Sequence, residues 1–186
     1  MTDRRVVAEI GSCNGDLALA IDTAQAAIEA GAWMVKGQMY QADTLTTKTA
    51  ASYGYESIKE KPTQYEAFSN ALSYDEWAKV TESVDGRFFA SVFDLEACKE
   101  YPYHLIKLAS ADITYKALVE AAAATGAHVI MSTGAATRGE INDAMGWLSD
   151  VDAGNGSARP TLLVCTLAYP CPPEHEIGRA SSRERV

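Results

Sequence analysis

Short runs of β-branched and apolar residues alternate along this chain with longer stretches of helical periodicity. The expected strands are residues 6–10, 33–38, 87–92, 104–108, 128–132 and 161–165. Strict alternation of strands with helices predicts parallel strands joined by right-handed crossovers. The fold class is therefore expected to be α/β, with a (β/α) barrel and a doubly wound open sheet as the competing architectures.

Glycine patterning and strand count separate these two architectures. No Gly-x-Gly-x-x-Gly motif follows any expected strand, which weakens the dinucleotide-binding form of the open sheet. A complete barrel has eight strands, and the chain offers about six. The sequence therefore predicts an incomplete (β/α)8 TIM-type barrel with about six of eight strand-helix units.

Capping residues place the helices between these strands. Expected helices cover residues 17–30, 64–71, 74–84 and 115–125, a short stretch after Asp94, and residues 138 to about 149. Ser73 with Glu76 and Thr137 with Glu140 form capping boxes, and Thr114 is expected to cap the helix that follows it. The connection over residues 39–62 is long, and a loop of that length in a compact domain is usually functional.

Charge and composition exclude several classes of partner. The formal net charge of -9 disfavours nucleic acid and anionic membranes. No apolar run has the length of a membrane span, and the first residues lack a signal-peptide layout, so a cytoplasmic location is expected. The four cysteines form no Cys-x-x-Cys pair and are expected to be free thiols.

The last residues break the strand-helix pattern. Residues 176–186 carry no core-facing period and match the translation of a common sequencing adapter. We interpret residues 1–175 as the partial barrel and residues 176–186 as a non-native tail. The alternative is a genuine basic tail.

Two lysines stand inside apolar strands, where an ammonium group is costly unless it is paired or functional. Lys36 follows Met34-Val35, and Lys107 lies in Leu105-Ile106-Lys107-Leu108. In a barrel the carboxyl ends of the strands carry the active site. With Ser110, Ser132 and Thr133 on neighbouring strands, the lysines could hold a phosphate and a carboxylate. The alternative is that both lysines point outward.

Other titratable residues divide between the two ends of the strands. Glu9 and Asp112 lie near carboxyl ends, where they could move protons or position a sugar, or simply pair with the lysines. His104 and His128 begin strands, so they are expected at the opposite, stability face and not among metal ligands.

These pieces together resemble the N-acetylneuraminate (sialic acid) synthase family. The matching motifs are Ala8-Glu9-Ile10-Gly11, Asn14-Gly15-Asp16, Val35-Lys36-Gly37-Gln38, Ala42-Asp43-Thr44-Leu45, Phe93-Asp94, Ile106-Lys107-Leu108-Ala109-Ser110, Met131-Ser132-Thr133-Gly134, Cys165-Thr166 and Tyr169-Pro170. They fall in family order and cover nearly the whole chain to Pro173. The motif at Ser12-Cys13-Asn14-Gly15 is one residue shorter than usual and lacks the family's histidine.

The resemblance implies condensation of phosphoenolpyruvate with an N-acetylated amino sugar such as N-acetylmannosamine, with release of phosphate. It assigns Glu9 and Asp112 to the sugar and the water. Substrate contacts are implied for Lys36, Gln38, Ser91, Lys107, Ser110, Ser132, Thr133, Thr166 and Tyr169.

The resemblance also implies parts that this chain does not contain. In the family a divalent metal, Mn or Mg, polarises the sugar aldehyde, and its histidine ligands lie on the last two strands. No metal ligand is therefore expected here. A homodimer is expected for the parent enzyme, and the fragment alone is expected to be inactive and aggregation-prone, with bare first and sixth strands. Two alternatives stay open: another barrel that condenses phosphoenolpyruvate with a sugar phosphate, and a non-catalytic carbohydrate-binding relative.

Overall fold

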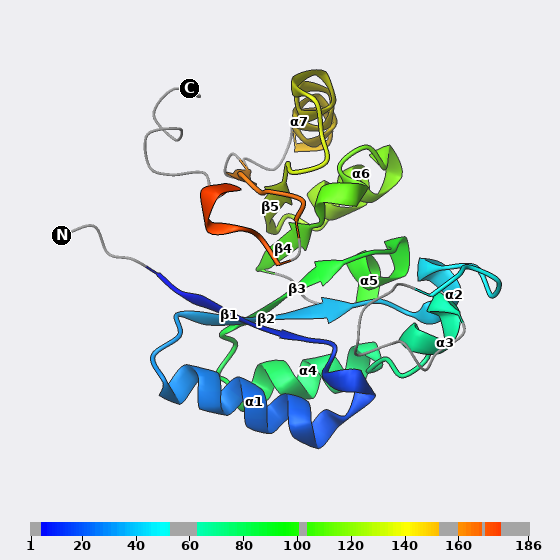
Figure 1. Ribbon diagram of the computed structural model, residues 1–186. Helices are drawn as coiled ribbons and strands as arrows, with labels where there is room; N and C mark the ends of the chain where they lie inside the picture. Colours follow the sequence, from blue (N-terminus) through cyan, green and yellow to red (C-terminus); the bar gives the residue numbers. More distant parts are fainter. Residues whose placement is uncertain (1–4, 53–62, 101–103, 153–159, 169, 176–186) are drawn as a thin grey trace. The chain divides into compact units, whose positions relative to one another are not determined.

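The computed structural model describes residues 5–52, 63–100, 104–152, 160–168 and 170–175 (Figure 1). The chain divides into two compact units, Met1–Ile106 and Lys107–Val186. Each unit is described below by itself. The interpreted tail and most of the glycine-containing loop before the last strand lie outside the described residues.

The first unit is a three-stranded parallel sheet covered by helices. Strand β2 (Met34–Met39) lies between β1 (Val7–Gly11) and β3 (Phe88–Val92). Helices α1 (Leu17–Glu29) and α4 (Tyr74–Ser83) run side by side along this sheet (Figure 1). A short helix, α5 (Leu95–Glu100), follows β3. The predicted strands and helices of this unit are confirmed to within a few residues at their ends.

A glycine sits where helix α4 meets the sheet. The Trp77 indole stacks on the Phe88 ring, with 5.2 Å between centroids and 20° between planes. A Cβ atom added at Gly37 would lie 2.7 Å from the Trp77 ring, which is closer than real Cβ contacts come. Burial of a side chain as large as Trp77 stabilises a fold by about 2–3 kcal/mol. The close approach of helix to sheet therefore depends on the missing side chain at Gly37.

The connection from β2 to α4 is more ordered than a loop. It contains α2 (Ala42–Leu45) and α3 (Gln64–Phe68), and an isolated antiparallel bridge joins Ala51 to Thr63. We call its described residues, 40–52 and 63–72, the arm. In Figure 1 the arm helices lie beyond the carboxyl end of β2. The sequence predicted a long functional connection here and missed α2, which is only four residues long.

The second unit continues the strand-helix alternation. Its elements are β4 (Leu105–Leu108), which spans the division between the units, α6 (Lys116–Ala124), β5 (His128–Ser132), α7 (Arg138–Asp152) and β6 (Thr161–Leu163). Strands β5 and β6 pair in parallel, with Ser132 opposite Leu163. Helices α6 and α7 lie side by side (Figure 1).

The helix caps predicted from the sequence can be compared with the observed caps one residue at a time. The box of Ser73 with Glu76 is present in full, and Glu140 accepts from the backbone N–H and hydroxyl of Thr137 as predicted. The cap at Thr114 is wrong, because α6 begins at Lys116 and, within the described residues, no side chain caps it. A 3₁₀ turn over Ser110–Asp112 precedes this helix, and the Asp112 carbonyl accepts from the backbone N–H of Tyr115. That turn displaces the helix start past Thr114.

The remaining general predictions concern cysteines and membrane spans. All four cysteines lie in the described part of the chain and are free thiols, as predicted. Across the ranges that the structure describes, no helix combines the length and apolarity needed to cross a bilayer.

Candidate functional site

Lys36 connects all three strands of the first unit through its ammonium group. Its Nζ donates to Ser91 Oγ at 3.0 Å and forms an ion pair with Glu9. The Lys36 side chain is 12% exposed, whereas that of Glu9 is 46% exposed. A nearly buried lysine therefore has both a charge partner and a hydroxyl partner, which is what the low polarity of its surroundings requires.

Strand register explains why these side chains meet. Glu9 is opposite Lys36, and Gln38 is opposite Ser91. Side chains alternate between the faces of a strand, so all four residues share one face of the sheet. The other face carries Gly37 and Phe88, which contact Trp77 of α4. The polar group therefore lies on the sheet face opposite α4.

The turn after β1 holds strained backbone beside this group. Gly11, Cys13, Asn14 and Gly15 all have positive φ, between 47° and 70°. For the non-glycine residues this conformation costs about 1 kcal/mol each or more. A Cβ atom at Gly15 would lie 2.9 Å from the backbone of Asn70, so the turn packs closely on the end of the arm. Glu9 Oε1 accepts from the Gly11 backbone N–H at 2.9 Å, which fixes the carboxylate beside Lys36.

In the second unit, Asp112 is a half-buried residue whose carboxyl lies close to Lys107. Its Oδ2 atom has no hydrogen-bond partner among the residues that the structure describes. Burial raises the pKa of the Asp112 carboxyl, and the nearby positive charge of Lys107 offsets this only in part. Such a carboxyl holds its proton at a higher pH than an exposed aspartate, which suits proton transfer.

Hydroxyl groups gather at the carboxyl ends of β4 and β5 in the same unit. Ser110 Oγ accepts from the Gly134 backbone N–H at 3.2 Å, and Thr133 Oγ1 donates to the Leu163 carbonyl at 3.0 Å. Ser132 is 3% exposed at the end of β5. A Cβ atom at Gly134 would come within 3.2 Å of Ser110 Oγ, so glycine allows this approach. The cluster offers hydroxyl donors of the kind that bind phosphate and carboxylate oxygens.

A comparison with protein-family models decides the family. Residues 23–177 match the model of the NeuB family. The chain belongs to the NeuB family. The resemblance drawn from the motifs is thereby confirmed.

Two curated relatives are named as synthases of pseudaminic acid and of N,N'-diacetyllegionaminic acid. The chain is 32% identical to the pseudaminic acid synthase of Helicobacter pylori over 176 residues, which is 89% of this chain and 51% of the relative. It is also 32% identical to the N,N'-diacetyllegionaminic acid synthase of Legionella pneumophila, over 89% of this chain and 49% of the relative. The chain thus spans about half the length of the curated NeuB proteins it matches.

Solved structures confirm the fold class, an α/β incomplete TIM-type barrel. An N-acetylneuraminic acid synthetase from Leptospira borgpetersenii, solved with citrate, superposes with a TM-score of 0.72 at 26% identity. The match covers 91% of this chain and 56% of that one. A phospho-2-dehydro-3-deoxyheptonate aldolase from Thermotoga maritima, at 11% identity and a TM-score of 0.60, shares the fold alone.

The NeuB motif residues form two groups, one in each unit. Glu9, Lys36, Gln38 and Ser91 share one face of the first sheet. The second group is Lys107, Ser110, Asp112, Ser132 and Thr133. Convergence of Lys36 and Lys107 on one ligand stays a prediction.

Two candidate residues remain, Thr166 and Tyr169. Thr166 Oγ1 donates to the His175 carbonyl at 2.9 Å, and this bond does not join it to either group. Tyr169 lies outside the described residues.

Metal ligands do not cluster in this NeuB chain over the ranges that the structure describes, because no three His, Cys, Asp or Glu side chains gather there.

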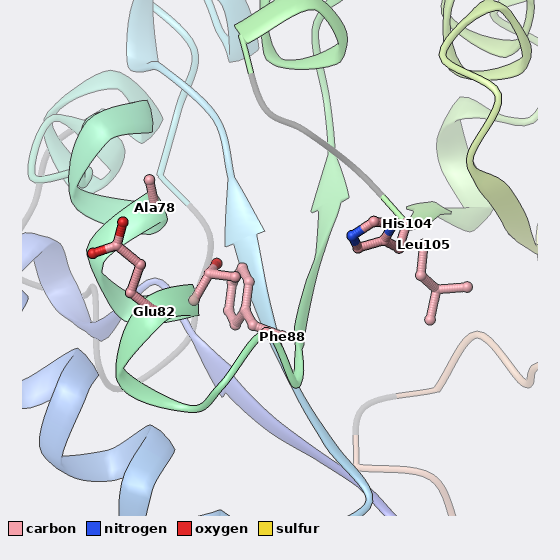
Figure 2. A pocket seen from close by; sticks show the side chains of 7 residues that line it. Ala78, Glu82, Phe88, His104 and Leu105 are labelled. Atoms are coloured by element: carbon pink, nitrogen blue, oxygen red, sulfur yellow. The ribbon is translucent and has the colours of Figure 1, made fainter.

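A pocket of about 220 Å³ lies where β3 and β4 begin, between Glu82 on α4, Phe88 and His104 (Figure 2). Ser91 lies towards the other end of β3. His104 therefore lies at the opposite end of the strands from Ser91 and its partner Lys36, as the sequence predicted.

One buried polar residue was missed as part of the site. Asp94 lies two residues after the end of β3, is 7% exposed and accepts hydrogen bonds from three chain segments. The sequence analysis placed it only before a short helix and within a family motif. A carboxylate that follows the apolar pair Val92-Phe93 at the end of a strand was the signal that could have found it.

Proposed function

We propose that this NeuB chain binds phosphoenolpyruvate and forms part of an enzyme that condenses it with an N-acetylated amino sugar. The product would be a nonulosonic acid of the sialic, legionaminic or pseudaminic type. The names of the curated relatives support this class of reaction. The observation that carries the proposal is the contact of Lys36 with Ser91, beside Glu9, on the sheet face opposite α4.

Lys36 and Ser91 would bind one anionic group of phosphoenolpyruvate. Without ligand, the Glu9 carboxylate neutralises the ammonium group. An incoming phosphate or carboxylate would take over part of that role, because charge-assisted hydrogen bonds are strong where water is sparse. Gln38, opposite Ser91, would add an amide donor on the same face.

The second unit would bind the other anionic group. Ser110, Ser132 and Thr133 supply hydroxyl donors, and Lys107 supplies charge. Thr166 and Tyr169 would contribute to the sugar side, as the family resemblance implies.

The proposed reaction forms one carbon-carbon bond and one carbon-oxygen bond to water, and it breaks the carbon-oxygen bond to phosphate. The methylene carbon of phosphoenolpyruvate attacks the sugar aldehyde, water adds to the resulting cation, and phosphate leaves. Asp112, with its raised pKa, would exchange a proton with the water, and Glu9 would orient the sugar hydroxyl groups.

The divalent metal, Mn or Mg, would have to be held by residues other than those that the structure describes. Since the described residues hold no cluster of three metal-ligating side chains, no step here is assigned to a metal. Metal ligands outside this chain, a homodimeric parent and a cytoplasmic location remain proposals.

Calorimetric titration with phosphoenolpyruvate tests the proposal. The wild-type chain should bind it, and Lys36→Met should weaken binding by about 10- to 100-fold, the cost of a hydrogen bond to a charged group. Lys79→Met removes an exposed lysine of α4 and should leave the affinity unchanged. A melting curve for each variant checks that it folds.

Three results would overturn this assignment. Binding of N-acetylmannosamine without phosphoenolpyruvate would identify a carbohydrate-binding relative. Preference for a sugar phosphate would identify the other condensing barrel. Equal losses in Lys36→Met and Lys79→Met would remove Lys36 from the site.

A further inference from the structure

Asp94 joins three segments of the first unit at the carboxyl end of β3. Its Oδ2 atom accepts from Thr44 Oγ1 of α2 at 2.7 Å, and its Oδ1 atom accepts from the Ala97 backbone N–H of α5 at 2.7 Å. The Tyr74 hydroxyl, at the start of α4, donates to Oδ1 at 3.2 Å. One buried carboxylate thus ties the arm, α4 and α5 together.

An aromatic cluster fastens the same arm independently. The Tyr40 ring meets Phe68 of α3 edge-on at 5.4 Å and Phe93, the neighbour of Asp94, edge-on at 6.0 Å. The two ends of the arm are also joined, because Gln41 Nε2 donates to the Leu72 carbonyl at 3.2 Å. The arm is therefore a fixed structure at the strand ends, with Asp94 as its polar anchor.

The position of the arm relates it to the second substrate. Lys36 and Ser91 lie within the strands, on the sheet face opposite α4. The arm starts two residues after Gln38, beyond the carboxyl end of β2 (Figure 1). The arm therefore lies at the carboxyl end of the strand that carries Lys36 and Gln38.

We infer that Asp94 is a positioning residue that holds the arm as a preformed wall for the amino sugar, an inference that rests on the proposed function. Asp94 itself touches no substrate. It acts by fixing Thr44 and Tyr74, so the arm does not have to be ordered when the sugar binds. Its loss should therefore weaken sugar binding and leave the anion contact of Lys36 intact.

Asp94→Asn is the informative variant because it keeps the shape of the side chain. The substitution removes the negative charge and turns one of the two acceptor oxygens, which face Thr44 Oγ1 and the Ala97 backbone N–H, into an amide NH₂ group. Thr44→Val and Tyr74→Phe each remove one donor. Asp85→Asn is the matched control, an exposed aspartate at positive φ at the other end of β3, where asparagine is readily accommodated.

The test measures two affinities and one exchange rate for each variant. Calorimetry gives the affinity for phosphoenolpyruvate alone and then for N-acetylmannosamine with phosphoenolpyruvate present. In Asp94→Asn we expect sugar affinity to fall about tenfold or more while phosphoenolpyruvate affinity stays within about twofold. Thr44→Val and Tyr74→Phe should show smaller losses of the same kind. Amide hydrogen exchange should rise in residues 40–45 and 64–68.

Failures of this inference and of the proposed function are distinguishable. Unchanged exchange in the arm of Asp94→Asn would overturn the anchoring role. Equal loss of both affinities would show a merely structural residue and overturn the positioning role. A wild-type chain that binds phosphoenolpyruvate and no sugar would overturn this inference alone. A wild-type chain that binds neither ligand would overturn the proposed function, and the sugar wall with it.

Discussion

Lys36 on β2 and Ser91 on β3 are 55 positions apart in sequence, yet the ammonium nitrogen lies 3.0 Å from the hydroxyl oxygen. Neighbouring parallel strands bring them together, and Glu9 on β1 completes the group. A hydroxyl group beside an ammonium group is suited to binding an anion.

The Ser91 hydroxyl should contribute to anion affinity without supporting the fold. We expect Ser91→Ala to weaken phosphoenolpyruvate binding by about tenfold or more, because a hydrogen bond to a charged group is worth about 1.5–3 kcal/mol. The free energy of unfolding should change by less than about 1 kcal/mol, since Lys36 keeps its ion pair with Glu9. Calorimetric titration and urea unfolding measure the two quantities. A large loss of stability would assign Ser91 to the core instead.

Gly37 should tolerate no side chain. We expect Gly37→Ala to destabilise the chain by about 1–3 kcal/mol, because the new methyl group would collide with the Trp77 ring. Gly146 in α7 is the control, since a Cβ atom there meets nothing within 4 Å. Gly146→Ala should stabilise by about 0.5–1 kcal/mol through helix propensity. Urea unfolding of both variants checks the contrast, and a neutral Gly37→Ala would contradict the tight contact.

Asp112 should make stability depend on pH in an unusual direction. Burial raises the pKa of this carboxyl in the folded chain above its ordinary value of 3.8. Its ionisation therefore destabilises the fold above the folded pKa, and this penalty vanishes as pH falls below the ordinary value. Asp112→Asn should be more stable than wild type at pH 7 by about 1 kcal/mol, with the gap closing at acid pH.

Chemical unfolding at several pH values measures the stability effect at Asp112. The exposed Asp143 of α7 serves as control, and Asp143→Asn should show no such trend. A gap between Asp112→Asn and wild type that widens towards acid pH would contradict the raised pKa.

The capping box at α4 should matter, whereas the threonine before α6 should not. Ser73→Ala removes the hydroxyl that accepts from the Glu76 backbone N–H at 3.3 Å and should cost about 1 kcal/mol. Thr114→Ala lies just outside α6 and should change the free energy of unfolding by less than about 0.5 kcal/mol. Equal effects in the two variants, measured by thermal unfolding, would contradict the observed start of α6.

Period and capping patterns were enough to predict the strands, most helices and the fold class. These patterns determine which residues are buried and where helices start, and they depend only on residues that are close together in sequence. The start of α6 was missed because a 3₁₀ turn over Ser110–Asp112 uses the residues that would otherwise open the helix. Asp94 was missed because its donors, Thr44 and Tyr74, come from segments that only the folded chain brings together.

The sequence predicted which residues belong to the candidate site better than it predicted how their side chains are arranged. Lys36 could be placed within a strand and Ser91 near a strand end from the hydrophobic pattern, and their contact followed from the register. The ion pair of Glu9 with Lys36 was one of two open readings, and it exists; whether Glu9 also serves a sugar stays a prediction. Sequence spacing alone cannot distinguish a carboxylate that only forms an ion pair from one that also contacts a substrate.

The alternation along β2, with Gly37 against Trp77 and Lys36 on the opposite side, has a consequence for how such a chain can evolve. A slip of one residue in that strand would bury the ammonium under the indole and expose the glycine to the ligand side. Mutations that loosen the packing of Trp77 on Gly37 would thus displace Lys36 before they unfold the protein. Selection for close packing of Trp77 is therefore, at this strand, also selection for the position of the anion-binding lysine.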